Sequence, residues 1–122
     1  MDASTQAALD KDKVIDITTK GRKSGAAQRI EIWYHRVDGR YYITGRPGPR
    51  SWYANLVADG SMTFHLKESA QADLAAQAVV VSEAGEKRRV LAAAPELVEP
   101  IGDDIESWVT GAPLVEVIFE WG

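Results

Sequence analysis

Hydrophobic and polar residues alternate along several short stretches of the chain, and a period of two indicates half-buried β-strands. The alternation predicts strands over residues 14–19, 30–37, 40–45, 62–67, 72–81 and 114–121. In the last of these, Val115, Val117, Phe119 and Trp121 share one face, which we expect to be buried. Asp38-Gly39 separates the second strand from the third, and this dipeptide predicts a tight hairpin because it tolerates positive φ angles.

A helical period appears in three other segments. It predicts short helices over residues 51–58, 82–94 and 103–109, while the polar residues 1–13 are expected to form a short helix or an arm. Ser51 and Ser82 are the expected N-caps of the first two helices. Asp103 with Glu106 three residues later resembles a capping box for the third. The basic run 87–89 is expected on a solvated helix face.

Six strands joined mostly by hairpins, without a repeating β-α-β order, favour a mainly β (α+β) fold in which peripheral helices surround a small antiparallel barrel. The chain has 122 residues, of which 45% are hydrophobic, so it can bury a core of its own. We find no internal repeat, low-complexity tract or linker. We therefore expect one domain over residues 14–122, preceded by the N-terminal segment 1–13.

Composition excludes several classes of function. The net charge is -4, which argues against general nucleic-acid binding. The absence of cysteine excludes disulfides, thiolate metal sites and cysteine nucleophiles, and two separated histidines predict no metal site. No window reaches the ~20 apolar residues of a membrane span, and residues 1–13 do not resemble a secretory signal. We therefore expect a cytoplasmic protein without an integral membrane segment.

A basic, glycine-containing loop stands out against this acidic background. Four of the 14 basic residues lie within one ten-residue stretch, as Lys20, Arg22, Lys23 and Arg29. Two glycines interleave these cations, so backbone N–H groups can approach an anion that Lys and Arg neutralise. This chemistry suits a phosphate or polycarboxylate tail. The alternative is a solvated basic turn between two strands.

The other candidate residues are less specific. Arg46-Pro47-Gly48-Pro49-Arg50 must be a loop, because its prolines lack backbone donors. Trp52 follows it and lies either in the core or against a planar ligand. His35 and His65 alternate with apolar neighbours, so we expect both on outer faces of strands, where either is a minor candidate for a proton donor.

The order of these motifs resembles the deazaflavin-dependent nitroreductase family, which belongs to the flavin and deazaflavin oxidoreductases. Gly21-Arg22-Lys23-Ser24-Gly25 matches the loop of that family in full. Trp52-Tyr53-Ala54-Asn55-Leu56 matches its helix start, except that Ala54 stands where His is frequent. The resemblance covers residues 14–66 well and is weak from Lys67 onward, apart from the terminal apolar strand.

The resemblance implies a six-stranded antiparallel split β-barrel of the FMN-binding type. It also implies a reductase that transfers hydride from reduced coenzyme F420, a deazaflavin with a phospholactyl-oligoglutamate tail, to a small planar electron-poor substrate such as a quinone, enone or nitro compound. It implies no particular catalytic residue. By position, it implies cofactor contacts for Lys20, Arg22, Lys23, Ser24, Gly25, Arg29, Gly45, Arg46, Pro47, Gly48, Arg50, Trp52 and Asn55.

The chain also departs from the family pattern. The loop over residues 44–50 is shorter and more basic, and it lacks the serine associated with the ring. All four tyrosines lie at or before Tyr53, so the tyrosine-rich segment of nitro-reducing members is missing. Two alternatives stay open: an FMN-binding split-barrel reductase, and a non-catalytic carrier of a flavin, haem or lipid. Split barrels of this kind are often homodimers, although no sequence feature here fixes the oligomeric state.

Overall fold

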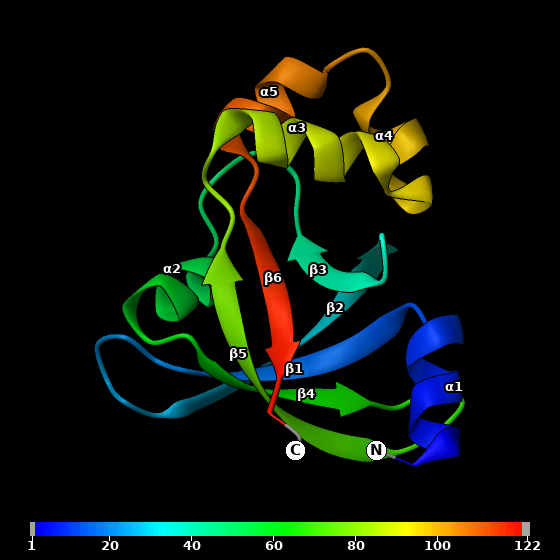
Figure 1. Ribbon diagram of the computed structural model, residues 1–122. Coiled ribbons are helices and arrows are strands. Elements are labelled where there is room, and N and C mark those ends of the chain that lie inside the picture. The colour runs from blue at the N-terminus through cyan, green and yellow to red at the C-terminus, as the bar shows by residue number, and fades with distance from the viewer. Residues whose placement is uncertain (1, 121–122) are drawn as a thin grey trace.

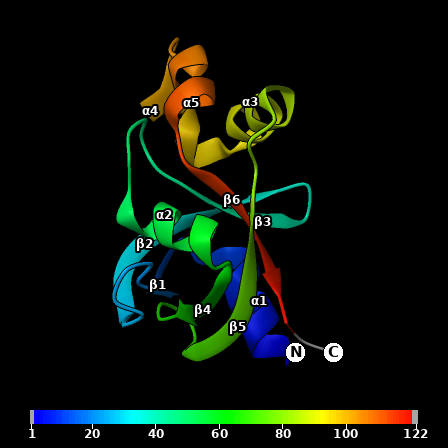
Figure 2. The same cartoon turned by 90° about the vertical axis from the view of Figure 1, so that its left-hand side faces the viewer.

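A closed barrel of six antiparallel strands dominates the computed structural model, which describes residues 2–120 (Figures 1 and 2). Around the barrel the strands follow the order β1-β2-β3-β6-β5-β4. Their bounds are β1 (Val14–Lys20), β2 (Ala27–Val37), β3 (Arg40–Thr44), β4 (Ser61–Leu66), β5 (Ala72–Val80) and β6 (Leu114–Phe119). The predicted strands and fold class are confirmed, although β2 begins three residues earlier than predicted. The predicted position of Trp121 lies outside the described residues.

The strand pairing closes the barrel through contacts that are distant in sequence. β1 pairs with β2 and with β4, and β6 inserts between β3 and β5. The predicted hairpin joins β2 to β3, where Asp38 and Gly39 both have positive φ angles, 54° and 74°. These angles are those that a type I′ turn requires.

Short helices surround the barrel. They are α1 (Ala3–Lys11), α2 (Ser51–Ala58), α3 (Ala84–Ala93), α4 (Val98–Ile101) and α5 (Ile105–Gly111), with the 3-10 turn η1 (Pro95–Leu97) before α4. Figure 1 shows α3, α4 and α5 gathered above one end of the barrel, a group that we call the helical cap, and α1 at the other end. The 3-10 turn η1 and helix α4 lie between two predicted helices, in a segment for which no element was predicted. No helix in the described part of the chain is long and apolar enough to cross a membrane.

Two of the predicted N-caps are wrong. Ser51 is the first residue of α2 rather than its cap, and Arg50 precedes it without a side-chain capping bond. Helix α3 is capped by Glu83 rather than Ser82, because the Glu83 carboxylate accepts hydrogen bonds from the first backbone N–H groups of the helix. Both helices nevertheless lie within two residues of their predicted bounds.

Tertiary contacts explain two further corrections in the helical cap. The predicted capping box is absent at α5, because Glu106 instead accepts two hydrogen bonds from the Arg88 guanidinium on α3. Lys87 was expected in solvent but is only 7% exposed. Its ammonium group donates to the Ala112 carbonyl, 2.8 Å away, at the C-terminal end of α5. Cations are favourable there because the last helix carbonyls lack partners.

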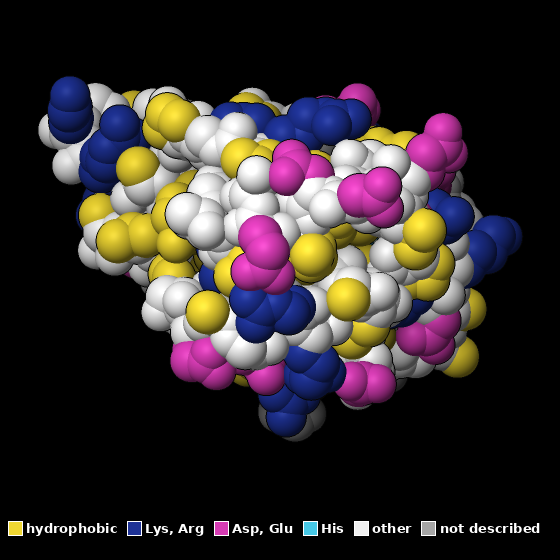
Figure 3. Space-filling model, turned by 90° about the horizontal axis from the view of Figure 1, so that it is seen from above, with side chains coloured by type: hydrophobic (Ala, Val, Ile, Leu, Met, Phe, Trp, Pro, Cys, Tyr) yellow, Lys and Arg dark blue, Asp and Glu magenta, His cyan; other side chains and the backbone are white. Residues whose placement is uncertain are grey.

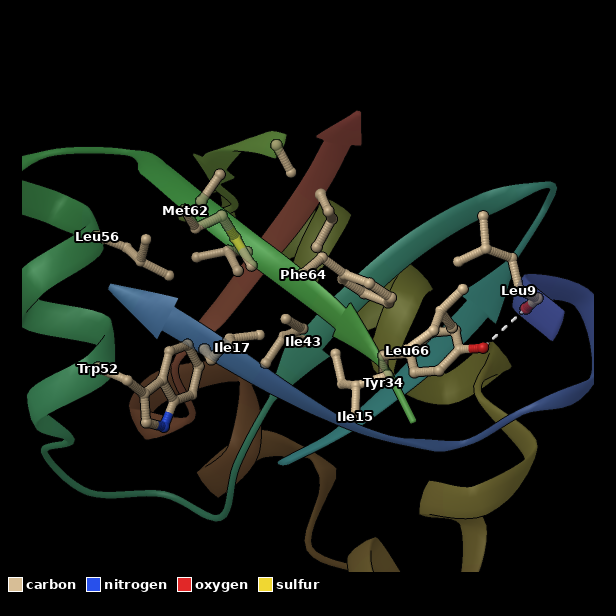
Figure 4. Close-up of a cluster of buried hydrophobic side chains, with 14 of the residues drawn as sticks. Leu9, Ile15, Ile17, Tyr34, Ile43, Trp52, Leu56, Met62, Phe64 and Leu66 are labelled. Atoms are coloured by element: carbon tan, nitrogen blue, oxygen red, sulfur yellow. Dashed lines mark hydrogen bonds between the residues drawn. The ribbon is translucent and has the colours of Figure 1, made fainter. Parts of the chain in front are cut away.

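The molecule has two hydrophobic cores, one on each side of the barrel wall. The first fills the barrel, where Tyr34 and Phe64 pack edge to face with ring centroids 5.1 Å apart (Figure 4). The Tyr34 hydroxyl donates to the Leu9 carbonyl at 2.9 Å and so fixes α1 against the barrel. The second core lies between the outer surface of the barrel and the helical cap, and it includes Tyr42, Leu91 and Trp108. This second core positions the cap over β2 and β3.

Candidate functional site

The basic loop between β1 and β2 is held in one conformation by its own backbone. Gly21 N–H donates to the Ala26 carbonyl, and Gly25 N–H donates to the Gly21 carbonyl, each at 2.8 Å. Gly25 has a φ of 75°, and a Cβ added at Gly21 would lie 2.8 Å from the Ser24 hydroxyl oxygen. The positive φ favours glycine at position 25, and the space beside Gly21 is tight, so the hydrogen-bonded turn depends on both residues.

Asn55 joins this loop to α2. The side chain is 1% exposed, and its oxygen accepts hydrogen bonds from the backbone N–H and the guanidinium of Arg22, at 3.1 and 2.9 Å. Its amide nitrogen donates to Thr19 Oγ1 and Gln28 Oε1 at 3.1 and 3.0 Å. These four bonds show that Asn55 orients the loop. Its contact with a cofactor ring stays a prediction.

The loop borders an open hollow of about 430 Å³. Its lining residues are Lys20, Gly21, Arg22, Lys23, Ser24, Gly25, Ala58 and Asp59. Lys20 and Lys23 are exposed, and neither ammonium group has an ion-pair partner within residues 2–120. Figure 3 shows Lys and Arg side chains at its left-hand end, the side on which Figure 1 shows the loop between β1 and β2. Three cations facing one carboxylate give the hollow a net positive charge, which suits an anionic ligand.

A second, larger cavity lies between the barrel wall and the helical cap. Its volume is about 550 Å³, within the range of small-molecule sites. It is lined by Ile32, Trp33, His35, Thr44, Gly45, Arg46, Glu96, Leu97, Pro100 and Trp108. Two indole rings and several aliphatic side chains make its walls predominantly apolar, so a flat aromatic ligand would find large contact surfaces here. We call this space the cap cavity.

Sequence reasoning missed most of the cap cavity. Trp33, Trp108, His35 and Glu96 come from β2, α5 and η1, and no motif connects these segments along the chain. Only the tertiary structure brings these four residues together. Of the predicted cofactor contacts, only Gly45 and Arg46 line this cavity, together with His35, the minor candidate for a proton donor.

The remaining predicted residues lie elsewhere. Gly48 and Arg50 border a different hollow of about 500 Å³ together with Lys87, and Pro47 lies against Gly111 in the helical cap. Arg29 forms an ion pair with Asp16 on the neighbouring strand, with 3.0 Å between its Nε and the carboxylate. The predicted residues therefore form two groups, around the basic loop and around the 45–50 loop, and not one continuous pocket.

Trp52 belongs to the barrel core. Its side chain is 8% exposed and packs in the same cluster as Leu56, one turn further along α2. It lines neither the hollow of the basic loop nor the cap cavity. A packing role is therefore shown for Trp52, and its contact with a cofactor ring stays a prediction.

The two histidines alternate out of the barrel as expected, but both are covered rather than exposed. His65 is 6% exposed, and its ring nitrogens lie 2.7 Å from Thr18 Oγ1 and from Asp73 Oδ1. His35 is 4% exposed beneath the helical cap. Its Nδ1 lies 3.7 Å from the Glu96 carboxylate, too far for a hydrogen bond, and has no other partner within residues 2–120.

The burial of His35 predicts a dependence of stability on pH. Burial lowers the pKa of His35 below its usual 6.5, and the Glu96 carboxylate only partly opposes this effect. Above pH 6.5 the imidazole is neutral in both the folded and the unfolded chain. As the pH falls below that value the unfolded chain binds the proton first, so the contribution of His35 to stability is lost. We expect His35→Gln to lose less thermal stability than wild type on going from about pH 7.5 to about pH 5.5.

Circular dichroism melts across this pH range measure the effect, with His65→Gln as the matched control for loss of a buried histidine ring. The comparison uses the slope of melting temperature against pH, because either substitution also changes stability at neutral pH. Equal slopes in wild type and His35→Gln would contradict the prediction.

Comparison with solved structures supports the fold assignment. A conserved hypothetical protein of Mycobacterium tuberculosis superposes with a TM-score of 0.73 at 15% identity, covering 99% of this chain and 82% of its own. A general stress protein 26 relative from Clostridium acetobutylicum, of the pyridoxinephosphate oxidase family, gives 0.73 at 11% identity and covers 96% and 82%. An F420-H2 dependent reductase, FDR-A, gives 0.58 at 18% identity and covers 87% and 94%. At these identities the likeness shows a shared fold.

Comparison of the sequence itself identifies the family. No curated protein sequence matches the chain. A family model, however, described as F420H(2)-dependent quinone reductase, matches residues 1–117, which is nearly the whole length. The chain therefore belongs to the F420H(2)-dependent quinone reductase family, and it is an oxidoreductase whose coenzyme is the deazaflavin F420.

Proposed function

We propose that this protein reduces a small, planar, electron-poor substrate, with a quinone or enone favoured over a nitro compound, by hydride transfer from reduced F420. One observation carries the proposal: a cation-lined hollow and an apolar cavity lie along the same strand. The basic loop leads directly into β2, and the cap cavity takes Ile32, Trp33 and His35 from the second half of that strand. At ~3.3 Å per residue, roughly 20 Å of strand separates Ala27 from Trp33, which suits an elongated ligand with an anionic tail and a flat ring.

The basic loop fits the tail of F420. Its phosphodiester and glutamate carboxylates are anions, and Lys20, Arg22 and Lys23 supply the matching cations around a rigid glycine-containing backbone. Charge-assisted hydrogen bonds of this kind are stronger than neutral ones. The single phosphate of FMN would use fewer of these cations, which favours F420 over the alternative flavin.

The cap cavity fits the flat rings of the coenzyme and the substrate. When bound, the coenzyme supplies the hydride, while the protein supplies position and electrostatics. Trp33 and Trp108 offer flat apolar surfaces against which a ring can pack. Hydride transfer requires donor and acceptor within ~3–3.5 Å, so the shape of this cavity controls which substrates react.

The binding test replaces the two lysines of the basic loop, whose ammonium groups form no ion pair within residues 2–120. Lys20→Ala with Lys23→Ala should raise the Kd for F420 about 10- to 100-fold, because two charge-assisted contacts are lost. Binding is followed by protein tryptophan fluorescence and coenzyme absorbance at several salt concentrations. The wild-type affinity should fall with salt, and the double variant should show a weaker salt dependence.

The matched control is Lys11→Ala with Lys13→Ala, which removes the same charge from exposed positions at and beside the far helix α1. If the two double variants lose the same amount of F420 affinity, then net charge, and not the basic loop, determines binding. FMN binding tighter than F420 would favour the flavin alternative. A protein that binds reduced F420 tightly but oxidises it with no quinone, enone or nitroarene would be a carrier.

A further inference from the structure

The cap cavity contains few groups that can move a proton. A quinone takes up one hydride and one proton to become a hydroquinone, so its reduction requires a proton source at the same site. The Thr44 hydroxyl is already engaged, because its O–H donates to the Pro113 carbonyl, with 2.5 Å between the two oxygens. Arginine does not act as a proton donor in proteins, which sets Arg46 aside. Among the lining residues this leaves the pair His35 and Glu96.

His35 and Glu96 form a largely buried pair whose facing atoms are not hydrogen-bonded. His35 comes from β2 and Glu96 from η1, and their side chains are 5% and 14% exposed. The 3.7 Å between His35 Nδ1 and Glu96 Oε1 is an ion-pair distance but not a hydrogen bond. Buried polar atoms are nearly always hydrogen-bonded, and His35 Nδ1 is one of two side-chain exceptions within residues 2–120. This nitrogen is buried next to Glu96, so a proton added to it would lie beside the carboxylate, while the imidazole as a whole lines the cavity.

We propose that His35, with its charge balanced by Glu96, is the proton donor that completes the reduction of the substrate in the cap cavity. This inference rests on the proposed function. The hydride brings both electrons to the quinone, and an oxygen of the resulting anion takes the proton. The N–H bond of the imidazolium breaks as the O–H bond of the hydroquinone forms. The neutral imidazole then regains a proton from water, and the Glu96 carboxylate stabilises the imidazolium again.

The charges around His35 are consistent with this role. Burial lowers the pKa of His35 below its usual 6.5, which makes the imidazolium a stronger acid, and Glu96 only partly opposes this effect. The neighbouring Arg36 on β2 lowers it further. Arg46 lines the same cavity, and Tyr42 is the cross-strand partner of His35 on β3. A carboxylate facing the imidazole from η1 therefore opposes the effects of burial and of Arg36.

Steady-state kinetics with reduced F420 and 1,4-naphthoquinone test the proposal. The coenzyme is kept saturating, so that lost binding is not mistaken for lost chemistry. In wild type, kcat should fall as the pH rises above the pKa of His35 in the complex. His35→Gln should lower kcat about 100-fold and remove this limb of the profile, since general acids contribute about 10²–10⁴-fold. Glu96→Gln should move the limb to lower pH, because the imidazolium loses its carboxylate. The control Glu99→Gln, at an exposed position in the adjacent α4, should change neither.

Nitrogen NMR of the histidines in coenzyme-free protein gives a readout without turnover. The chain has only two histidines, and His65 serves as the internal reference. The His35 resonances should shift on addition of 1,4-naphthoquinone and should titrate at lower pH in Glu96→Gln. If wild type turns over and His35→Gln keeps its rate and pH profile, the inference is overturned and the proposed function stands. If wild type shows no turnover, the proposed function fails instead. If the His35 resonances do not shift when the quinone is added, the inference is overturned, whether or not the wild type turns over.

Discussion

A chain truncated after Ala112 is expected not to fold, because β6 closes the barrel. β6 pairs with both β3 and β5, so its loss leaves two open strand edges. It also carries residues of both cores: Val115 and Val117 are buried in the barrel, and Leu114 is buried beneath the helical cap. The truncated chain should be insoluble, or should lack a cooperative melting transition by circular dichroism.

A pair of substitutions within β6 checks the same point in the full-length chain. Val117 is 3% exposed, whereas the next residue, Ile118, is 45% exposed and points out of the barrel. Val117→Asp should therefore prevent folding, because it buries an unpaired charge, and Ile118→Asp should be tolerated. A soluble truncated chain with a cooperative melt, or equal effects of the two substitutions, would show that β6 is dispensable for the core.

Trp52→Ala is expected to lower the free energy of unfolding by about 3–5 kcal/mol, the usual cost of removing a large aromatic side chain from a core. Figure 4 shows the indole reaching from α2 into the barrel core beside Ile17. Denaturant unfolding measures the loss. Trp33→Ala is the matched control, because Trp33 is 49% exposed and lines the cap cavity instead of the core. It should cost little stability and should reduce quinone turnover.

Trp52→Phe then tests whether this residue also contacts the cofactor ring. Phenylalanine keeps most of the apolar contact, so the variant should remain folded at working temperature. Unchanged F420 affinity and turnover would restrict Trp52 to packing. A clear loss of F420 affinity without loss of folding would support the ring contact that the family resemblance implies. A small stability loss in Trp52→Ala would contradict the position of the indole in the core.

Local patterns in the sequence were sufficient for the strands and for the basic loop. Alternation of apolar and polar residues follows directly from the period of a strand, and Asp38-Gly39 supports the hairpin because few residues accept its φ angles. The loop from Gly21 to Gly25 could be recognised because a rigid turn and a cluster of cations both depend on neighbouring residues. The helices were less certain at their ends, where Glu106 joined Arg88 across two helices instead of capping its own.

By itself, then, the sequence determined six strands, their fold class and a loop suited to an anionic tail, because each depends on residues close together in the chain. Only the tertiary structure decided which side chains share a cavity. The cap cavity brings His35 on β2 together with Glu96 and Trp108, which lie more than sixty residues later in the chain. The cavity exists because the second core holds the helical cap against the barrel. The same packing buries His35 and Lys87, whose polarity alone would place them in solvent, because a neighbouring element covers each of them.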